Sequence, residues 1–224
     1  MKLLALDTST ENCSVALWVD GEIVSRQELA GQRHSDLILP MLEELLGEAG
    51  ITLKSLDGIA FGEGPGSFTG LRIGCGVAQG LALGADLPVL GISTLLALAA
   101  AAPGDRVLAC LDARIGEIYH AAYEKQQGAW HTVSEPSLCF AKDAPALPGA
   151  GWVGAGSGFA AYAEALQLRY VGQLLSTDGS VYPQAREMLK LAAPLFEEGL
   201  GKDAALAAPL YIRNKVALKT AERK

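Results

Sequence analysis

Residues 3–10, LLALDTST, combine an apolar run typical of a buried strand with an aspartate and three hydroxyl side chains at its end. A similar run, ACLD at residues 109–112, opens the second half of the chain. In each half a β-type segment runs back after the aspartate, at residues 15–19 in the first half and at residues 117–123 in the second. Both halves therefore begin with the same predicted unit, a strand that ends in aspartate and a strand that returns from it.

A second pair of similar segments follows in the same order. Residues 59–61, IAF, lead into the glycine-rich loop 62–66, and residues 152–153, WV, lead into the glycine-rich loop 154–158. Each loop precedes a helical pattern of apolar residues. The repetition suggests two lobes related by duplication.

The length and composition suit two small lobes. Of the 224 residues, half are hydrophobic and 19% are charged, which is typical of a folded chain and not of a disordered one. We expect an α/β protein with an N-terminal lobe at residues 1–104 and a C-terminal lobe at residues 105–224, divided at Pro103-Gly104-Asp105.

Charge and patterning limit the possible partners. The net charge of −7 argues against a protein that binds nucleic acid alone, because Lys and Arg supply most of that affinity. The N-terminus does not resemble a signal peptide, and Gln79, Asp86 and Pro88 interrupt the apolar run 73–102, so we expect a cytoplasmic protein without a membrane helix. The cysteines form no CxxC pair, which predicts reduced thiols; they are Cys13, Cys75, Cys110 and Cys139.

One stretch offers a candidate ligand site. Asp7, Thr8, Ser9 and Thr10 place hydroxyls and backbone amides where a phosphate could bind, which makes them a candidate vestigial nucleotide site; the alternative is an ordinary Asx or Ser/Thr turn. The loop at residues 62–70 is not a P-loop, because it lacks the Lys-Ser/Thr pair and carries an acidic residue.

The residues themselves predict no catalytic or metal site. His34, His120 and His131 are isolated, without the helical spacing of a metal-binding pair. The sequence also has no GxSxG motif.

A glycine stripe marks the helix expected at residues 68–83. Gly76, Gly80 and Gly84 recur at every fourth position, and each costs about 1 kcal/mol of helix stability relative to alanine. We expect another backbone to approach this stripe closely and compensate the cost.

Five segments together resemble the TsaB family, also called YeaZ, of bacterial proteins required to form threonylcarbamoyladenosine in tRNA. The resemblance implies an actin-like ATPase fold of the ribonuclease H-like class, with a second lobe shortened relative to the catalytic paralogue TsaD. The segments are LALDTS (4–9), RHSDLILPML (33–42), GEGPGSFTGLRIG (62–74), LDARIGEIY (111–119) and PLYIRNKVALK (209–219).

The resemblance also implies that this chain is not an enzyme. TsaD carries two metal-binding histidines in an HxxxH pattern, and the matching positions here are Thr94 and Leu98, which cannot replace two imidazole ligands. ATP and metal would then belong to partner subunits. The alternative is a nucleotide-binding, kinase-like or peptidase-like enzyme of the same fold.

The family resemblance further implies a set of partners. The chain would bind and activate TsaD as a heterodimer, help recruit the ATPase TsaE, and reach tRNA indirectly, serving the adenosine beside the anticodon of tRNAs that read codons beginning with adenine. Without TsaD it would form a homodimer. We expect the contact surface on two helices, at residues 36–48 and 68–83, unless these pack only within their own lobe; the proposed contact residues are Leu37, Met41, Leu45, Leu71, Gly76, Gly80 and Gly84. A basic tail would contact tRNA or an acidic partner, unless it is simply solvated; its cations are Arg213, Lys215, Lys219, Arg223 and Lys224.

Overall fold

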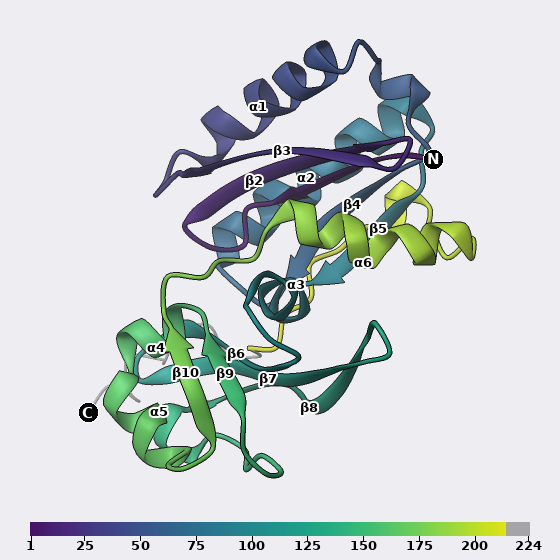
Figure 1. Ribbon diagram of the computed structural model, residues 1–224. Helices are drawn as coiled ribbons and strands as arrows, with labels where there is room; N and C mark the ends of the chain where they lie inside the picture. Colours follow the sequence, from purple (N-terminus) through teal and green to yellow (C-terminus); the bar gives the residue numbers. More distant parts are fainter. Residues whose placement is uncertain (214–224) are drawn as a thin grey trace.

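The computed structural model describes residues 1–213 as two lobes, each built on a five-stranded sheet (Figure 1). The strand order is β3-β2-β1-β4-β5 in the first sheet and β8-β7-β6-β9-β10 in the second, so the two lobes share one topology. In both sheets an antiparallel meander is extended by two parallel strands. The expected α/β architecture with a repeated unit is confirmed. Part of the expected basic tail, with Lys215, Lys219, Arg223 and Lys224, lies outside the described residues.

The strands and helices have the following bounds. The first sheet comprises β1 (Lys2–Asp7), β2 (Asn12–Val19), β3 (Glu22–Leu29), β4 (Gly58–Gly64) and β5 (Val89–Ser93). The second comprises β6 (Arg106–Arg114), β7 (Glu117–Gln126), β8 (Ala129–Phe140), β9 (Trp152–Ala155) and β10 (Leu174–Asp178). The helices are α1 (His34–Glu48), α2 (Phe68–Ala85), α3 (Thr94–Ala101), α4 (Ser157–Ala161), α5 (Ala163–Arg169) and α6 (Ala185–Glu197), with short 3-10 helices η1 (Leu53–Ser55), η2 (Ala141–Asp143) and η3 (Ala204–Leu206).

Strand β1 is buried on both faces, which explains its unbroken apolar run. Leu4 and Leu6 pack against α1 and α2 on one face of the sheet, whereas Leu3 and Ala5 pack against α6 on the other. Successive strand residues point to opposite faces, so a strand covered on both sides is apolar at every position. Asp7 is the last residue of this strand.

Residues 185–211 return to the first lobe, and this corrects the division at residue 104. Met188 of α6 is fully buried in the same core as Leu3, and Lys202 exchanges two backbone hydrogen bonds of 2.8 and 2.9 Å with Val89 of β5. The amphipathic pattern of α6 indicates that one helix face is buried but not which sheet covers it. From the sequence alone, this segment was therefore placed in the C-terminal lobe with the residues that precede it in the chain.

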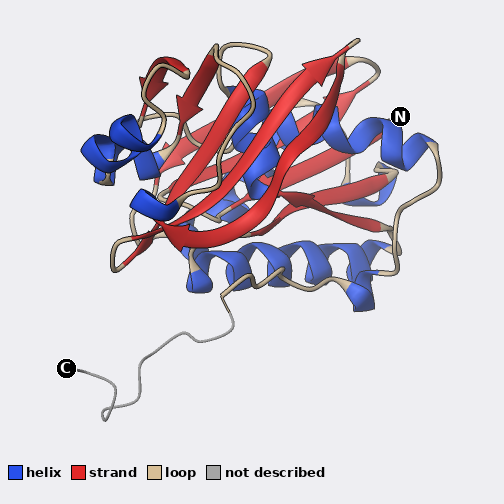
Figure 2. Ribbon diagram, turned by 90° about the horizontal axis from the view of Figure 1, so that it is seen from below, coloured by secondary structure: helices blue, strands red, loops and turns tan. Residues whose placement is uncertain are grey.

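Helix α3 connects the lobes and lies between their sheets (Figure 1). Its Leu95 and Leu98 pack with Val107 and Leu111 of the second sheet, while Ala97 belongs to the core around α6. The second lobe is otherwise covered by the short helices α4 and α5 (Figures 1 and 2). The helices within residues 1–213 include none that is long and apolar enough to cross a membrane.

Candidate functional site: the cleft between the lobes

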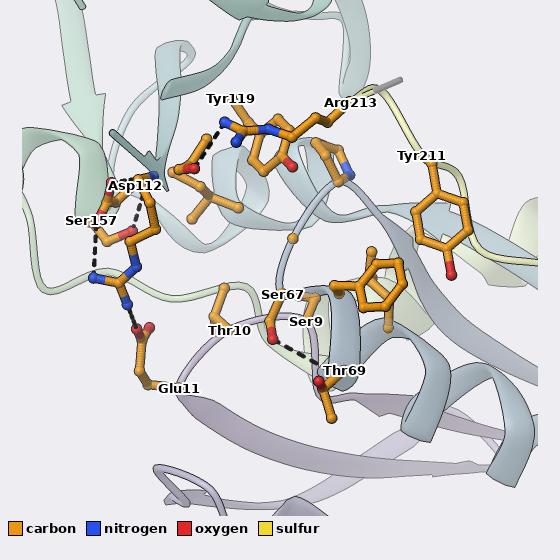
Figure 3. Close-up of a pocket in the computed structure, with 18 of the residues that line it drawn as sticks. Ser9, Thr10, Glu11, Ser67, Thr69, Asp112, Tyr119, Ser157, Tyr211 and Arg213 are labelled. Atoms are coloured by element: carbon orange, nitrogen blue, oxygen red, sulfur yellow. Dashed lines mark hydrogen bonds and ion pairs between the residues drawn. The ribbon is translucent and has the colours of Figure 1, made fainter. Parts of the chain in front are cut away.

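A cavity of about 890 Å³ lies between the two lobes (Figure 3). Four segments that are distant in sequence form most of its walls: the loop after β1, the loop after β4, the turn between β6 and β7, and residues 210–213. The polar residues labelled around it are Ser9, Thr10, Glu11, Ser67, Thr69, Asp112, Tyr119, Ser157, Tyr211 and Arg213.

The candidate site after β1 is divided between the cavity wall and the interior. Ser9 and Thr10 line the cavity, whereas Asp7 and Thr8 are buried behind it. The Asp7 carboxylate accepts hydrogen bonds from the Ser9 hydroxyl at 3.0 Å and from the Ser9 N–H at 3.4 Å. Burial raises the pKa of Asp7 to about 7, against the opposite effect of hydrogen bonds from Ser9 and Thr8. The amides that a phosphate would need are therefore already bonded to this side chain, as in an Asx turn.

The glycine-rich loop packs directly onto the turn after β1. The Ser67 N–H donates to the Ser9 carbonyl oxygen at 2.7 Å, and the Thr8 hydroxyl donates to the Gly70 carbonyl oxygen at 2.7 Å. A Cβ atom at Gly66 would overlap the Ser9 carbonyl oxygen, and one at Gly70 would overlap the Thr8 carbonyl oxygen. The glycines at these positions therefore permit two backbones to meet at the cleft.

The glycines of α2 that lie close to another backbone are not the ones expected. Gly66, Gly70 and Gly74 face the turn after β1, and a Cβ atom at Gly74 would lie 2.6 Å from the Thr8 hydroxyl oxygen. Around Gly76, Gly80 and Gly84, in contrast, no described atom outside the local helix backbone lies within 4 Å of a Cβ atom. The second stripe is on the exposed face of α2, so the alternative that it packs only within its own lobe is wrong, and its close approach by the backbone of a partner stays a prediction.

Three of the expected contact residues are core residues. Met41, Leu45 and Leu71 are 8%, 0% and 2% exposed, and Leu37 is half-buried against the core beneath α1. A helical apolar stripe indicates a buried face but does not distinguish the helix's own sheet from a partner. Of the expected contact residues, Gly76, Gly80 and Gly84 are exposed and Leu37 is half-buried, so only these four remain accessible to a partner.

The second lobe contributes another strand-end aspartate. The Asp112 carboxylate accepts from the Arg114 N–H at 2.7 Å and from the Tyr162 hydroxyl at 2.9 Å, and it forms an ion pair of 3.1 Å with the Arg114 guanidinium. The Asp112 N–H donates to the Ser157 hydroxyl oxygen at 3.0 Å. Both strand-end carboxylates, at Asp7 and Asp112, thus accept hydrogen bonds from donors of the chain itself.

The C-terminal segment forms the wall that sequence reasoning missed. Leu210 donates its N–H to the Glu63 carbonyl oxygen at 2.7 Å. The Arg72 guanidinium lies 3.5 Å from the centre of the Phe68 ring and donates to the Tyr211 hydroxyl at 3.0 Å. These contacts join residues about 140 positions apart in sequence, so local patterns carry no signal for them.

The positions that match the paralogue's metal histidines do not fit a metal. Thr94 and Leu98 are both 0% exposed. Leu98 fills the core between the sheets, and the Thr94 hydroxyl has no hydrogen-bond partner among the described residues. Within residues 1–213, no group of three or more His, Cys, Asp or Glu side chains is placed to hold a metal ion.

Two of the isolated histidines have structural contacts. The ring Nε2 of His34 lies 2.8 Å from the Thr10 carbonyl oxygen, and that of His120 lies 3.0 Å from the Tyr170 hydroxyl. Burial lowers the pKa of His120 to about 4, which favours the neutral ring.

Comparison with known proteins agrees with this architecture. The family model described as TsaD, tRNA N6-adenosine threonylcarbamoyltransferase, matches residues 21–220. A protein of Escherichia coli named tRNA threonylcarbamoyladenosine biosynthesis protein TsaB is 43% identical, over 98% of this chain and 97% of its own length. The protein of the same name from Haemophilus influenzae is 38% identical over 98% and 96% of the two chains.

A solved structure shows the same fold. The structure titled YeaZ from Pseudomonas aeruginosa has a TM-score of 0.87 at 41% identity, covering 94% of this chain and 99% of its own. Enzymes named tRNA N6-adenosine threonylcarbamoyltransferase match over less: the one from Trichlorobacter lovleyi is 33% identical over 41% of this chain and 32% of its own length.

The two sheets of common topology and the cleft between them define a protein of the actin-like, ribonuclease H-like class. Identity over nearly the full length narrows the assignment. The chain belongs to the TsaB (YeaZ) family of tRNA threonylcarbamoyladenosine biosynthesis proteins.

Proposed function

We propose that this chain is a non-catalytic subunit that binds and activates a TsaD-type transferase and helps recruit a TsaE-type ATPase during threonylcarbamoyladenosine formation in tRNA. The observation that carries the proposal is the state of the two strand-end carboxylates. Asp7 is buried and accepts a hydrogen bond from Ser9, and Asp112 accepts hydrogen bonds from Arg114 and Tyr162. A kinase-like enzyme of this fold would need carboxylates that hold Mg²⁺ beside the phosphates.

Under this proposal the cofactors and the tRNA belong mainly to the partners. ATP and the catalytic metal bind to the partner subunits, and tRNA is reached through the complex in the cytoplasm. Two features support this assignment: Thr94 and Leu98 are buried where metal ligands would be needed, and the chain's net charge of −7 disfavours binding to tRNA alone.

The exposed face of α2 is the proposed docking surface for TsaD. Phe68 and Leu83 are 42% and 59% exposed, and Gly76, Gly80 and Gly84 lie on the outer side of the same helix. Three exposed glycines weaken a helix without a compensating contact inside the chain. Close packing of a partner helix would supply that contact, and without TsaD a second copy would take its place as a homodimer.

A nucleotide-dependent enzyme is the competing function, favoured by the volume of the cleft alone. Titration of the isolated chain with ATP and Mg²⁺ separates the two proposals, because the favoured one expects no saturable heat of binding.

The partner role is tested by a reconstituted reaction that contains tRNA, threonylcarbamoyl adenylate, TsaD and TsaE, with and without this chain. We expect repeated turnover only when the chain is present. Equal turnover without it would contradict the proposed role.

A further inference from the structure

The turn between β6 and β7 is strained. Arg114, Ile115 and Gly116 have consecutive positive φ angles of 67°, 57° and 79°. This left-handed conformation is unfavourable for non-glycine residues, most of all for a β-branched residue such as Ile115. Such a turn persists only where surrounding contacts hold it. Asp112 and Tyr162 hold it from within the second lobe, and further contacts come from Glu11 of the first lobe and from the C-terminal segment.

One contact comes from the loop after β1. The Arg114 guanidinium lies 3.5 Å from the carboxylate of Glu11 across the cleft. Both side chains are largely exposed, at 75% and 51%, so solvent and salt weaken this ion pair.

A stronger contact comes from the C-terminal segment. The Arg213 guanidinium donates to the Glu117 carboxylate at 2.6 Å and to the Ala113 carbonyl oxygen at 2.9 Å. The two side chains are only 16% and 26% exposed, and a half-buried, charge-assisted pair with a second hydrogen bond is screened less than an exposed one. Figure 3 shows Arg213 and Glu11 at separate edges of the cleft.

The same segment is fixed to the first lobe at two earlier points. Lys202 pairs with Val89 through two backbone hydrogen bonds, and Leu210 donates to Glu63. Residues 202–213 therefore run along the first lobe and end on the strained turn of the second.

We propose that residues 202–213 form a strap and that Arg213 is its latch: the contact of Arg213 with Glu117 and Ala113 sets how far the cleft opens. The exposed pair of Arg114 and Glu11 is a weaker second tie. When Arg213 is released, the lobes separate about α3 and the strap loosens from Glu63. This inference concerns the isolated chain and does not depend on the proposed function.

The opening is measured by pulsed electron spin resonance on the full chain in a Cys139→Ser background. Spin labels at Lys54→Cys and Gln167→Cys place one probe on an exposed position of each lobe. Arg213→Ala is expected to add a population with a longer distance between the two labels. Glu117→Gln keeps a hydrogen-bond acceptor, so it is expected to add a smaller population at the longer distance. Arg33→Ala, which breaks an exposed pair with Glu28 inside the first lobe, is the matched control and is expected to leave the distances unchanged.

Hydrogen exchange provides the second readout. The Leu210 amide, which donates to Glu63, is expected to exchange roughly ten-fold faster in Arg213→Ala, the size of effect that loss of a charge-assisted hydrogen bond produces. If folded Arg213→Ala and Glu117→Gln both keep the unsubstituted distances and Leu210 exchange, the latch does not exist.

Discussion

The backbone N–H of Ser67 donates a hydrogen bond of 2.7 Å to the carbonyl oxygen of Ser9. This bond joins the loop after β4 to the loop after β1, so two cavity-lining loops of the first lobe are bonded to each other. The contact between these two loops depends on glycines that allow the two backbones to approach closely.

The two glycine stripes of α2 predict opposite responses to the same substitution. Gly70→Ala should lower the free energy of unfolding by about 1–3 kcal/mol, because the new methyl group overlaps the Thr8 carbonyl oxygen. Gly76→Ala should raise it by about 0.5–1 kcal/mol, because the site is open and alanine is the better helix former. Urea denaturation measures both. Equal effects of the two substitutions would show that the assignment of the stripes is incorrect.

The exposed stripe should be required for binding to TsaD. Gly80→Leu is expected to weaken association with TsaD by at least about ten-fold, equivalent to 1.4 kcal/mol, because a large side chain prevents close helix packing. Gln167→Leu, an equally exposed position on α5 in the other lobe, is the control and should bind normally. Sedimentation velocity gives the affinity and far-UV circular dichroism checks the fold. Loss of helical signal together with binding would indicate that the stripe serves this chain's own fold.

Substitutions in helix α1 should change the free energy of unfolding much more at buried positions than at exposed ones. Leu45→Ala is expected to cost about 2–5 kcal/mol of unfolding free energy, since Leu45 is fully buried. Leu39→Ala, at a 42% exposed position of the same helix, should change stability by less than about 0.5 kcal/mol. Thermal or chemical denaturation measures both, and a small loss for Leu45→Ala would refute its placement in the core.

Asp7 should make stability depend on pH. Its pKa is about 7 in the folded chain and about 4 when unfolded, so between these values the folded state holds the proton that the unfolded state has lost. The contribution of Asp7 to stability is therefore greatest below about pH 4 and falls as the pH rises to 7, by up to about 4 kcal/mol.

The control for this titration is Asp7→Asn, which cannot ionise. His120 acts with the opposite sign in an overlapping range, because its pKa is lowered to about 4, so the comparison uses the difference between the two proteins. The unfolding free energy of Asp7→Asn relative to the unsubstituted chain should rise from pH 4 to pH 7. A difference that stays constant would mean that Asp7 is ionised throughout.

Much of the fold was predictable from local patterns. The apolar runs ending at Asp7 and Asp112 identified the first strand of each lobe. Because these strands are buried on both faces, every position is apolar and the run is easy to recognise. The dipeptide Asp20-Gly21 is typical of a tight hairpin turn, and both residues have the positive φ angles that it favours.

The remaining features depend on contacts between distant segments. The pattern of α6 predicts a buried face but not its burial against β1, and nothing near Arg213 in sequence indicates Glu117 as its partner. The turn after Asp7 was predicted from the sequence, and its role as a ligand site stays a prediction. The hydrogen bond between the Ser9 hydroxyl and the Asp7 carboxylate depends on side-chain orientation, which the sequence does not indicate.

The central claim is that this chain supports a transferase without performing the transfer. The most direct measurement incubates the isolated chain with tRNA and threonylcarbamoyl adenylate and counts modified adenosine, with the mixture of chain, TsaD and TsaE as the positive control. The account predicts repeated turnover in the mixture and none with the chain alone. Modification of tRNA by the chain alone would contradict it and would place chemistry in the cleft between the lobes.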